Sequence, residues 1–215
     1  MHTPHLRVPF AQFFRSYLLM DVNPVIRFLI LSDIVWRSGV GLLTPVFPIF
    51  IIERIVGGNE LVAGVAATIG LITKGVFQVP AASIIDRIRG EKDDYWMMVC
   101  FSFLTLLMPL WHLVLRTPGQ LYLVEFFSNL FLAFTFPSFM AIFTRHVDKQ
   151  KEGTTWGLYF TLTDFAGAAA AAVGGAIALT LGFDTLIIAT VSVSILASFL
   201  LLPIHGKMRR ARPEA

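Results

Sequence analysis

The chain has 215 residues, of which 56% are hydrophobic and 14% are charged, and its mean hydropathy is +0.73. Soluble domains are usually about 45–50% apolar and about 25% charged, so this composition excludes a water-soluble globular fold. The 20 phenylalanines suit a surface that faces lipid. The formal net charge of +3 says little by itself, because the positions of the charges carry the information.

Six apolar segments are long enough to cross a bilayer, since a helix needs about 20 residues to span the hydrocarbon core. The runs are continuous rather than alternating, and this excludes strands as the spanning elements. Breaks that contain glycine, proline or charged residues separate the runs. The sequence therefore predicts an all-α, polytopic membrane domain over residues 25–205, with spans at 26–51, 61–85, 95–115, 119–143, 156–181 and 184–204.

Two segments flank the predicted membrane domain. Residues 1–24 form an N-terminal cytoplasmic segment, in which apolar residues between positions 5 and 20 recur at helical spacing. This pattern favours a short helix lying in the membrane interface, and a disordered basic tail is the alternative. Residues 206–215 form a short, basic cytoplasmic tail that we expect to carry no site.

The lysines and arginines set the orientation of the spans. Only Arg54 and Arg116 fall on one side of the membrane, and Arg37 and Lys74 lie within spans. All the others gather on the opposite side: Arg7, Arg15, Arg27, Arg87, Arg89, Lys92, Arg145, Lys149, Lys151, Lys207, Arg209, Arg210 and Arg212. Because positive charge marks the cytoplasmic side, we expect both termini in the cytoplasm and the protein in the inner or plasma membrane.

Two oppositely charged residues lie inside the first predicted span. Asp33 and Arg37 are four positions apart, so they share a helix face and can pair. Ionisable residues at membrane depth are costly and are candidates for a functional site. A water-filled cavity that binds a solute or carries a proton is one interpretation, and an internal ion pair that only orients the first span is the other.

Three further charged residues lie within later spans. Lys74 is near the middle of the second span, where its ammonium group needs an anionic partner, and Asp33 and Glu125 are the candidates. Glu125 belongs to the fourth span, and with Asp33, Arg37 and Lys74 it completes a candidate substrate or proton cavity. Asp164, in the fifth span, is a possible polar contact to another helix or a transport residue.

Small residues and prolines suggest close packing and bends. Gly167, Gly174 and Gly175 belong to an alanine-rich run in the fifth span, which would let two helix backbones approach closely. Pro45 in the first span and Pro137 in the fourth are expected to bend their helices, because proline leaves a carbonyl unpaired.

The pattern of six spans with a charged loop after the second resembles one half of a major facilitator superfamily transporter. The loop signature of that family runs Gly-x-x-x-Asp-Arg/Lys-x-Gly-Arg/Lys-Arg/Lys, and residues 82–92 read ASIIDRIRGEK. Asp86 and Arg87 match the signature. Ala82 replaces its first glycine, and Gly90 is displaced by one position from its second.

Other segments resemble the family as well, among them the proline-rich residues 44–48, the fourth-span residues 133–137 and the loop 151–157. The family's antiporter signature has a Gly-Pro where this chain has Ala170-Ala171, which disfavours drug/proton antiport. The resemblance implies that Asp86, Arg87 and Gly90 form a cytoplasmic gate loop. It also implies that spans 1, 2, 4 and 5 line the cavity.

The resemblance implies a half-size secondary transporter of a small solute that works by alternating access. Family members have about twelve spans with the site between two halves, so we expect a homodimer or a pair with a second half-size chain. A non-transporting membrane scaffold subunit is the alternative. No motif of an enzyme, a metal site or a cofactor site is present, and the basic residues follow the topology rather than a nucleic-acid surface.

Overall fold

The computed structural model describes residues 17, 19, 22–87 and 90–208, so most of the predicted interfacial helix and of the basic tail lies outside the described residues. Within these ranges every regular element is a helix and none is a strand: α2 (Pro24–Leu43), η1 (Thr44–Val46), α3 (Phe47–Arg54), α4 (Glu60–Arg87), α5 (Glu91–Leu107), η2 (Met108–Leu113), α6 (Pro118–His146), α7 (Glu152–Leu201) and η3 (Leu202–Lys207). Five helical stretches are long and apolar enough to cross a membrane. The predicted all-α, polytopic class is confirmed.

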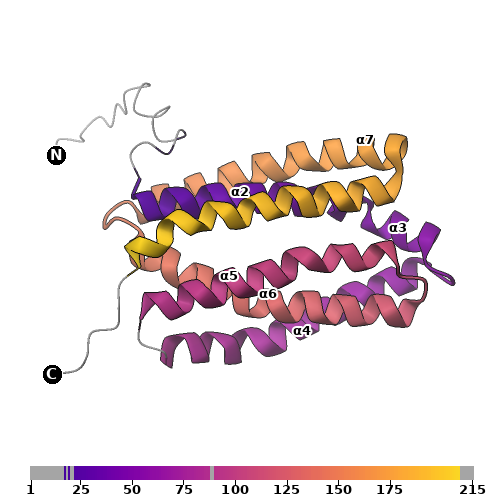
Figure 1. The fold of residues 1–215 in the computed structure, drawn as a ribbon, viewed down its shortest axis with the longest axis horizontal. Coiled ribbons are helices and arrows are strands. Elements are labelled where there is room, and N and C mark those ends of the chain that lie inside the picture. The colour runs from indigo at the N-terminus through magenta and orange to yellow at the C-terminus, as the bar shows by residue number, and fades with distance from the viewer. Residues whose placement is uncertain (1–16, 18, 20–21, 88–89, 209–215) are drawn as a thin grey trace, which may run out of the picture.

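The fifth stretch, Glu152–Lys207, is 56 residues long and folds back on itself. Gly182 interrupts α7 with φ 82° and ψ 171°, a conformation that is essentially restricted to glycine. Figure 1 shows the chain reversing there, so that the arm at 152–181 and the arm at 183–201 run side by side. Counting the two arms of α7 separately gives six helical segments of spanning length, which we call the six crossings, and the reversal falls at the break predicted between the fifth and sixth spans.

Prolines divide two of the predicted spans. The first span is not one helix, because α2 ends at Leu43 and the 3-10 turn η1 precedes α3. Pro45 lies in that turn and has no amide hydrogen to continue an α-helical ladder. The third span likewise changes from α5 to the 3-10 helix η2, in which Pro109 lies.

Polar residues fix where two helices begin. The Thr117 hydroxyl accepts from the Gln120 amide, and the Gln120 side chain accepts from the Thr117 amide, so α6 starts with a capping box. Helix α5 begins at Glu91, earlier than the predicted start at residue 95. Its first turn carries three acids, Glu91, Asp93 and Asp94. Their negative charges stabilise the helix because they lie at the positive end of its dipole.

The six crossings form two groups of three (Figure 1). One group contains α2 and both arms of α7, and the other contains α4, α5 and α6. The start of α2 and the end of α7 lie at the same end of the bundle, which is the predicted cytoplasmic end. Because the two groups face each other along their length, polar side chains on α2 and α7 can oppose those on α4, α5 and α6.

Close packing of α2 on α7 depends on glycines. A Cβ atom on Gly174 would lie 1.9 Å from the backbone oxygen of Leu42, and one on Gly41 would lie 3.3 Å from the backbone oxygen of Gly167. Gly167 and Gly174 therefore lie where the two backbones approach. Gly175 differs, since no described heavy atom beyond its chain neighbours and the adjacent backbone of its own helix lies within 4 Å of the position its Cβ would take.

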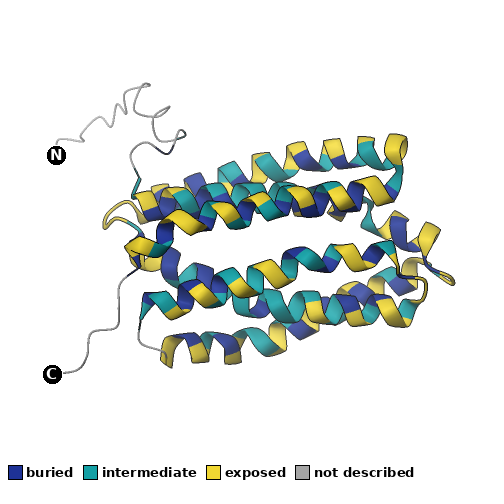
Figure 2. Cartoon of the chain, viewed as in Figure 1, coloured by how far each residue is buried: buried dark blue, intermediate teal, exposed yellow. Residues whose placement is uncertain are grey.

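The outer surface of the bundle is apolar. Figure 2 shows exposed residues on the outward faces of every long helix, and they include Leu71 and Leu179, which are 71% and 87% exposed. Large apolar side chains in such positions suit contact with lipid or with another membrane helix.

Candidate functional site

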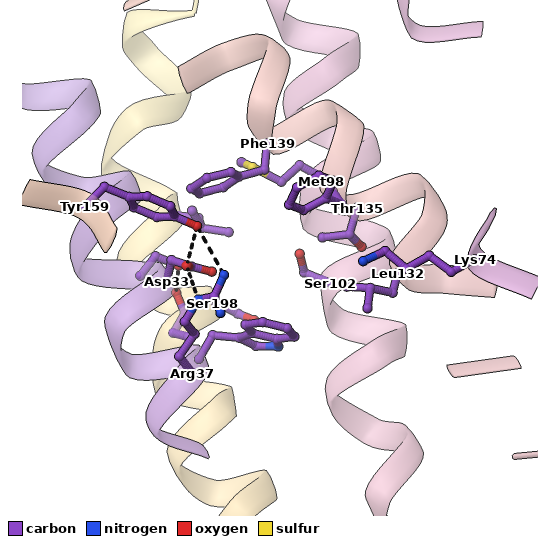
Figure 3. Close-up of a pocket in the computed structure, with 15 residues that line it drawn as sticks. Asp33, Arg37, Lys74, Met98, Ser102, Leu132, Thr135, Phe139, Tyr159 and Ser198 are labelled. Carbon is purple, nitrogen blue, oxygen red and sulfur yellow. Dashed lines mark hydrogen bonds and ion pairs between the residues drawn. The ribbon is translucent and has the colours of Figure 1, made fainter. Parts of the chain in front are cut away.

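A cavity of about 200 Å³ lies between the two groups of helices. We call it the central cavity, and Figure 3 shows its walls. Helices α2 and α7 contribute one wall, and α4, α5 and α6 contribute the other. Its polar lining residues are Ser32, Asp33, Arg37, Lys74, Ser102, Thr135, Tyr159 and Ser198. All six crossings therefore line the cavity, rather than spans 1, 2, 4 and 5 alone.

A cluster of three polar residues occupies the α2 and α7 wall. The Nε atom of Arg37 lies 2.9 Å from the Oδ2 atom of Asp33. The two residues are one helical turn apart on α2, and they form the ion pair that their spacing predicts. The hydroxyl of Tyr159, on the first arm of α7, donates to the same oxygen over 2.8 Å. A guanidinium nitrogen of Arg37 also lies 3.5 Å from the Tyr159 hydroxyl. The charge of Asp33 is thus compensated within this wall.

Lys74 stands on the opposite wall of the central cavity (Figure 3). Its ammonium nitrogen lies 5.1 Å from the centroid of the Phe136 ring, which is within the range of a cation–π contact. None of the ion pairs between described residues includes Lys74, so the expected pairing with Asp33 or Glu125 is wrong in this structure. The reason is tertiary: Arg37 and Tyr159 hold Asp33 on α2, and Glu125 lies in a different pocket.

Glu125 lines a second pocket of about 260 Å³, which we call the distal pocket because it lies toward the end opposite the start of α2. The Oε1 atom of Glu125 lies 3.9 Å from Nε2 of His112, and the Asn129 amide donates to Oε2 over 3.4 Å. Trp36 and Leu132 line both pockets, so the distal pocket adjoins the central cavity. The four predicted cavity residues therefore divide between two adjoining spaces.

Two buried polar atoms at the distal pocket have no hydrogen-bond partner in the described structure. They are Nε2 of His112 and Oγ1 of Thr190, whose residues are 6% and 1% exposed. Buried polar groups in proteins are nearly always hydrogen-bonded, so these two atoms are exceptions among the described residues. The distal pocket is thus built with free hydrogen-bonding capacity.

The predicted gate loop lies at the end where α2 begins. Asp86 and Arg87 are exposed at the end of α4, and neither forms an ion pair with another described residue. Gly90 precedes α5 with φ 147° and ψ 146°, a backbone conformation that favours glycine. The charged contacts at this end instead join α5 to α6.

Two such contacts join residues that the structure describes. Asp94 is buried and pairs with Arg145, and the Nε2 atom of His146 lies 3.7 Å from a carboxylate oxygen of Glu91. Both acids come from the first turn of α5, and both basic residues come from the last turn of α6. These contacts hold one end of α5 against α6. The paired charges on α5 follow the Asp86-Arg87 pair by a few residues in the sequence.

Asp164 lies on the exposed face of the first arm of α7. No hydrogen bond or ion pair with another described residue involves it. A polar contact from Asp164 to another helix is therefore absent from the described structure. Its carboxylate is available to a group outside this bundle.

The sequence did not identify Tyr159 or His112 as site residues. Both are neutral or weakly basic side chains in apolar runs, and nothing in their local pattern separates them from interfacial aromatics. The role of Tyr159 is visible only once α7 packs against α2. The role of His112 is visible only once η2 lies against α6. Among the described residues, no group of three or more His, Cys, Asp or Glu side chains could hold a metal ion.

Comparison with known proteins shows the family. The family model of the Major Facilitator Superfamily matches residues 30–214, so the chain belongs to this superfamily of membrane transporters. A crystal structure of the POT family transporter PepTSo superposes with a TM-score of 0.67 at 13% sequence identity. The alignment covers 89% of this chain and 39% of that chain, so the chain spans less than half the length of that transporter. No curated protein matches the chain.

Proposed function

We propose that this chain is one six-helix half of a secondary transporter for a small solute, and that two copies assemble to enclose the transport pathway. The observation that carries the proposal is the central cavity, where Asp33, Arg37 and Lys74 face a space between two groups of membrane helices. Charged groups around a cavity at membrane depth mark substrate or ion pathways. Alternating access would follow from rocking of one half against the other.

Two features support a second half. The matched transporter fold is longer than this chain, which covers 39% of the PepTSo chain. Asp164 faces outward from α7, and a carboxylate at the centre of a membrane helix costs about 2.5–3.5 kcal/mol on insertion scales. A partner helix or a water-filled pathway between two halves would remove that cost. We propose that Asp164 makes a polar contact at this boundary.

A second copy of the chain is the simplest partner. The start of α2 and the end of α7 lie at the same end of the bundle, so two copies can pack in parallel about an axis normal to the membrane. The halves of this superfamily are parallel repeats of that kind. Pairing with a different six-helix chain is the competing assembly, and the mass of the purified complex distinguishes the two.

Charge in the central cavity favours an anionic solute. Arg37 and Tyr159 compensate Asp33, whereas Lys74 on the opposite wall lies over the Phe136 ring and forms no ion pair with a described residue. An ammonium group in a partly buried site gains from an anion because the surroundings screen charge weakly. A carboxylate or phosphate on the solute would supply that anion.

A non-transporting scaffold subunit fits the structure less well. In a scaffold the polar residues of the spans would pair with one another and leave no cavity. Here Asp33 and Arg37 do pair, yet they still line a cavity together with Lys74. This arrangement favours a transported solute over a purely structural role.

The test is solute exchange in proteoliposomes that contain the purified protein. A panel of labelled anionic, cationic and neutral solutes would be compared for the wild type and for Asp33→Asn and Lys74→Met. We expect exchange of an anionic solute, with loss in both variants. Lys149→Met, at an exposed position in the loop before α7, is the control and should keep wild-type exchange.

The proposal fails if the wild type, folded and dimeric, exchanges no member of the panel. A preference for cationic solutes, or full activity in Lys74→Met, would leave the transporter assignment standing and would refute the anionic substrate class.

A further inference from the structure

The lining of the central cavity carries one uncompensated positive charge. Three of its residues are charged, namely Asp33, Arg37 and Lys74. The Asp33 carboxylate and the Arg37 guanidinium neutralise each other over 2.9 Å, so the Lys74 ammonium group leaves a net charge of +1. Opposite charges attract more strongly where water is partly excluded than they do in bulk water. A solute with one negative charge would neutralise this lining, whereas a dianion would leave an excess negative charge.

The surroundings of the Lys74 ammonium group suit a carboxylate. Figure 3 shows Lys74, Ser102 and Thr135 on the same wall of the cavity. The Thr135 hydroxyl donates its hydrogen to the backbone oxygen of Phe131 over 3.1 Å, so it can only accept from a further group. Ser102 also lines the cavity, and no hydrogen bond joins its hydroxyl to another described residue, so it can donate. Lys74 and Ser102 therefore offer one donor to each oxygen of a carboxylate.

Four aromatic side chains contribute to the remaining walls. Trp36 comes from α2, Phe136 and Phe139 come from α6, and Tyr159 comes from α7. The Lys74 ammonium nitrogen lies 5.1 Å from the centroid of the Phe136 ring, and the rings of Phe139 and Tyr159 lie 6.0 Å apart. Offset and edge-to-face contacts between rings are favourable beyond the area that they bury. An aromatic solute therefore fits these walls better than a sugar, whose hydroxyls would each need a partner.

The size of the central cavity limits the solute to one ring. Its volume is about 200 Å³. An apolar cavity of about 150 Å³ is large enough to bind benzene. The difference leaves room for a carboxylate beside a single ring, and a second ring would require the two groups of helices to separate.

We propose that the central cavity binds a monocarboxylate with a single aromatic ring, with its carboxylate at Lys74 and Ser102 and its ring against Trp36 and the aromatic side chains of α6. The inference rests on the proposed transport function and narrows the anionic solute to one charge and one ring. A phosphate monoester is disfavoured, because a phosphate group on a protein carries about −1.5 to −2 charges at pH 7.

Binding of four small probes to the purified protein in nanodiscs tests the inference. Benzoate has one charge and one ring, benzamide has the ring without the charge, phthalate has the ring with two charges, and acetate has the charge without the ring. Equilibrium dialysis against empty nanodiscs corrects for partition into lipid. We expect benzoate to bind about ten-fold or more tightly than each of the other three, because a charge-assisted hydrogen bond contributes on that scale.

Two variants test the carboxylate contact itself. Lys74→Met should weaken benzoate binding about ten-fold or more and leave benzamide binding unchanged, because only the charged probe needs the ammonium group. Ser102→Ala should weaken benzoate binding by less, since it removes a neutral donor. Lys149→Met, at an exposed position in the loop before α7, is the matched control and should bind benzoate as the wild type does.

Absence of benzoate binding would overturn the inference, as would equal or tighter binding of phthalate, benzamide or acetate. Undiminished benzoate binding in a folded Lys74→Met protein would do the same. The comparison of the four probes uses the wild type alone, so its result stands even if a variant does not fold. A protein that exchanges other solutes without binding benzoate would refute this inference and leave the proposed transport function intact. Benzoate binding without any solute exchange would refute transport alone.

Discussion

The hydroxyl of Tyr159 lies 2.8 Å from the Oδ2 atom of Asp33, and this hydrogen bond joins the first arm of α7 to α2. The same carboxylate oxygen lies 2.9 Å from the Nε atom of Arg37. Asp33 therefore receives one contact from its own helix and one from its neighbour. The cluster therefore joins α2 to the first arm of α7 at the wall of the central cavity.

Replacing Tyr159 by phenylalanine should weaken the link between α2 and α7. The change removes one hydrogen bond to a charged group, which is worth about 1.5–3 kcal/mol. Both partners are shielded from solvent, since Tyr159 is 1% exposed and the Asp33 side chain is 14% exposed. Solute exchange should fall several-fold. Tyr122→Phe is the matched control, because the Tyr122 hydroxyl makes no hydrogen bond to a described residue. Equal unfolding midpoints and exchange rates for the two variants would refute a role for the Tyr159 hydroxyl.

Gly174→Ala should disrupt the packing of α2 on α7. The new Cβ would lie 1.9 Å from the backbone oxygen of Leu42, so one backbone must move away, and overpacking of this kind costs about 1–3 kcal/mol. Gly175→Ala is the control at the next position, where the Cβ meets no atom within 4 Å. Thermal unfolding in detergent should show a lower midpoint for Gly174→Ala only. A similar decrease in both variants would argue against the close approach at Gly174.

Gly182→Ala should destabilise the reversal between the two arms of α7. With φ 82° and ψ 171°, the position suits glycine, and a residue with a side chain there costs about 1–3 kcal/mol. Gly119→Ala, in the first turn of α6 at an open position, is the control. The thermal unfolding midpoint is the measurement. An unchanged midpoint for Gly182→Ala would contradict a glycine-specific turn.

The ion pair between Asp94 and Arg145 predicts an order of effects. Arg145→Gln leaves the buried carboxylate of Asp94 without its cation, and we expect a loss of about 2 kcal/mol, less than for a fully buried pair because Arg145 is 38% exposed. Asp94→Asn should cost less, since the solvent can reach Arg145. Asp93→Asn, at the exposed neighbouring position, should have little effect. Denaturation midpoints test the order, and the reverse ranking of Arg145→Gln and Asp94→Asn would contradict the assigned burial.

Hydropathy was sufficient to predict the crossings, because the bilayer fixes both the length and the composition of a spanning helix. The break at Gly182 was also readable from its turn residues. The 3-10 segments at Pro45 and Pro109 were not, since the apolar run continues through both prolines. A proline in a membrane helix signals a bend, but the neighbouring helices decide how the freed carbonyls are satisfied.

The candidate site was only partly readable from the sequence. The pairing of Asp33 with Arg37 follows from helical spacing alone. The surroundings of Lys74 and Glu125 depend on which helices face each other, and no local pattern encodes that. His112 became part of the site only because η2 places its ring opposite α6.

The oligomeric mass of the purified protein in nanodiscs tests the central claim most directly. One chain has a mass of 23.9 kDa, and native mass spectrometry resolves one copy from two. The account predicts two copies per particle, which would give twelve crossings around one pathway. A strict single copy that still exchanges solute would contradict the assembly of two six-helix halves from this chain.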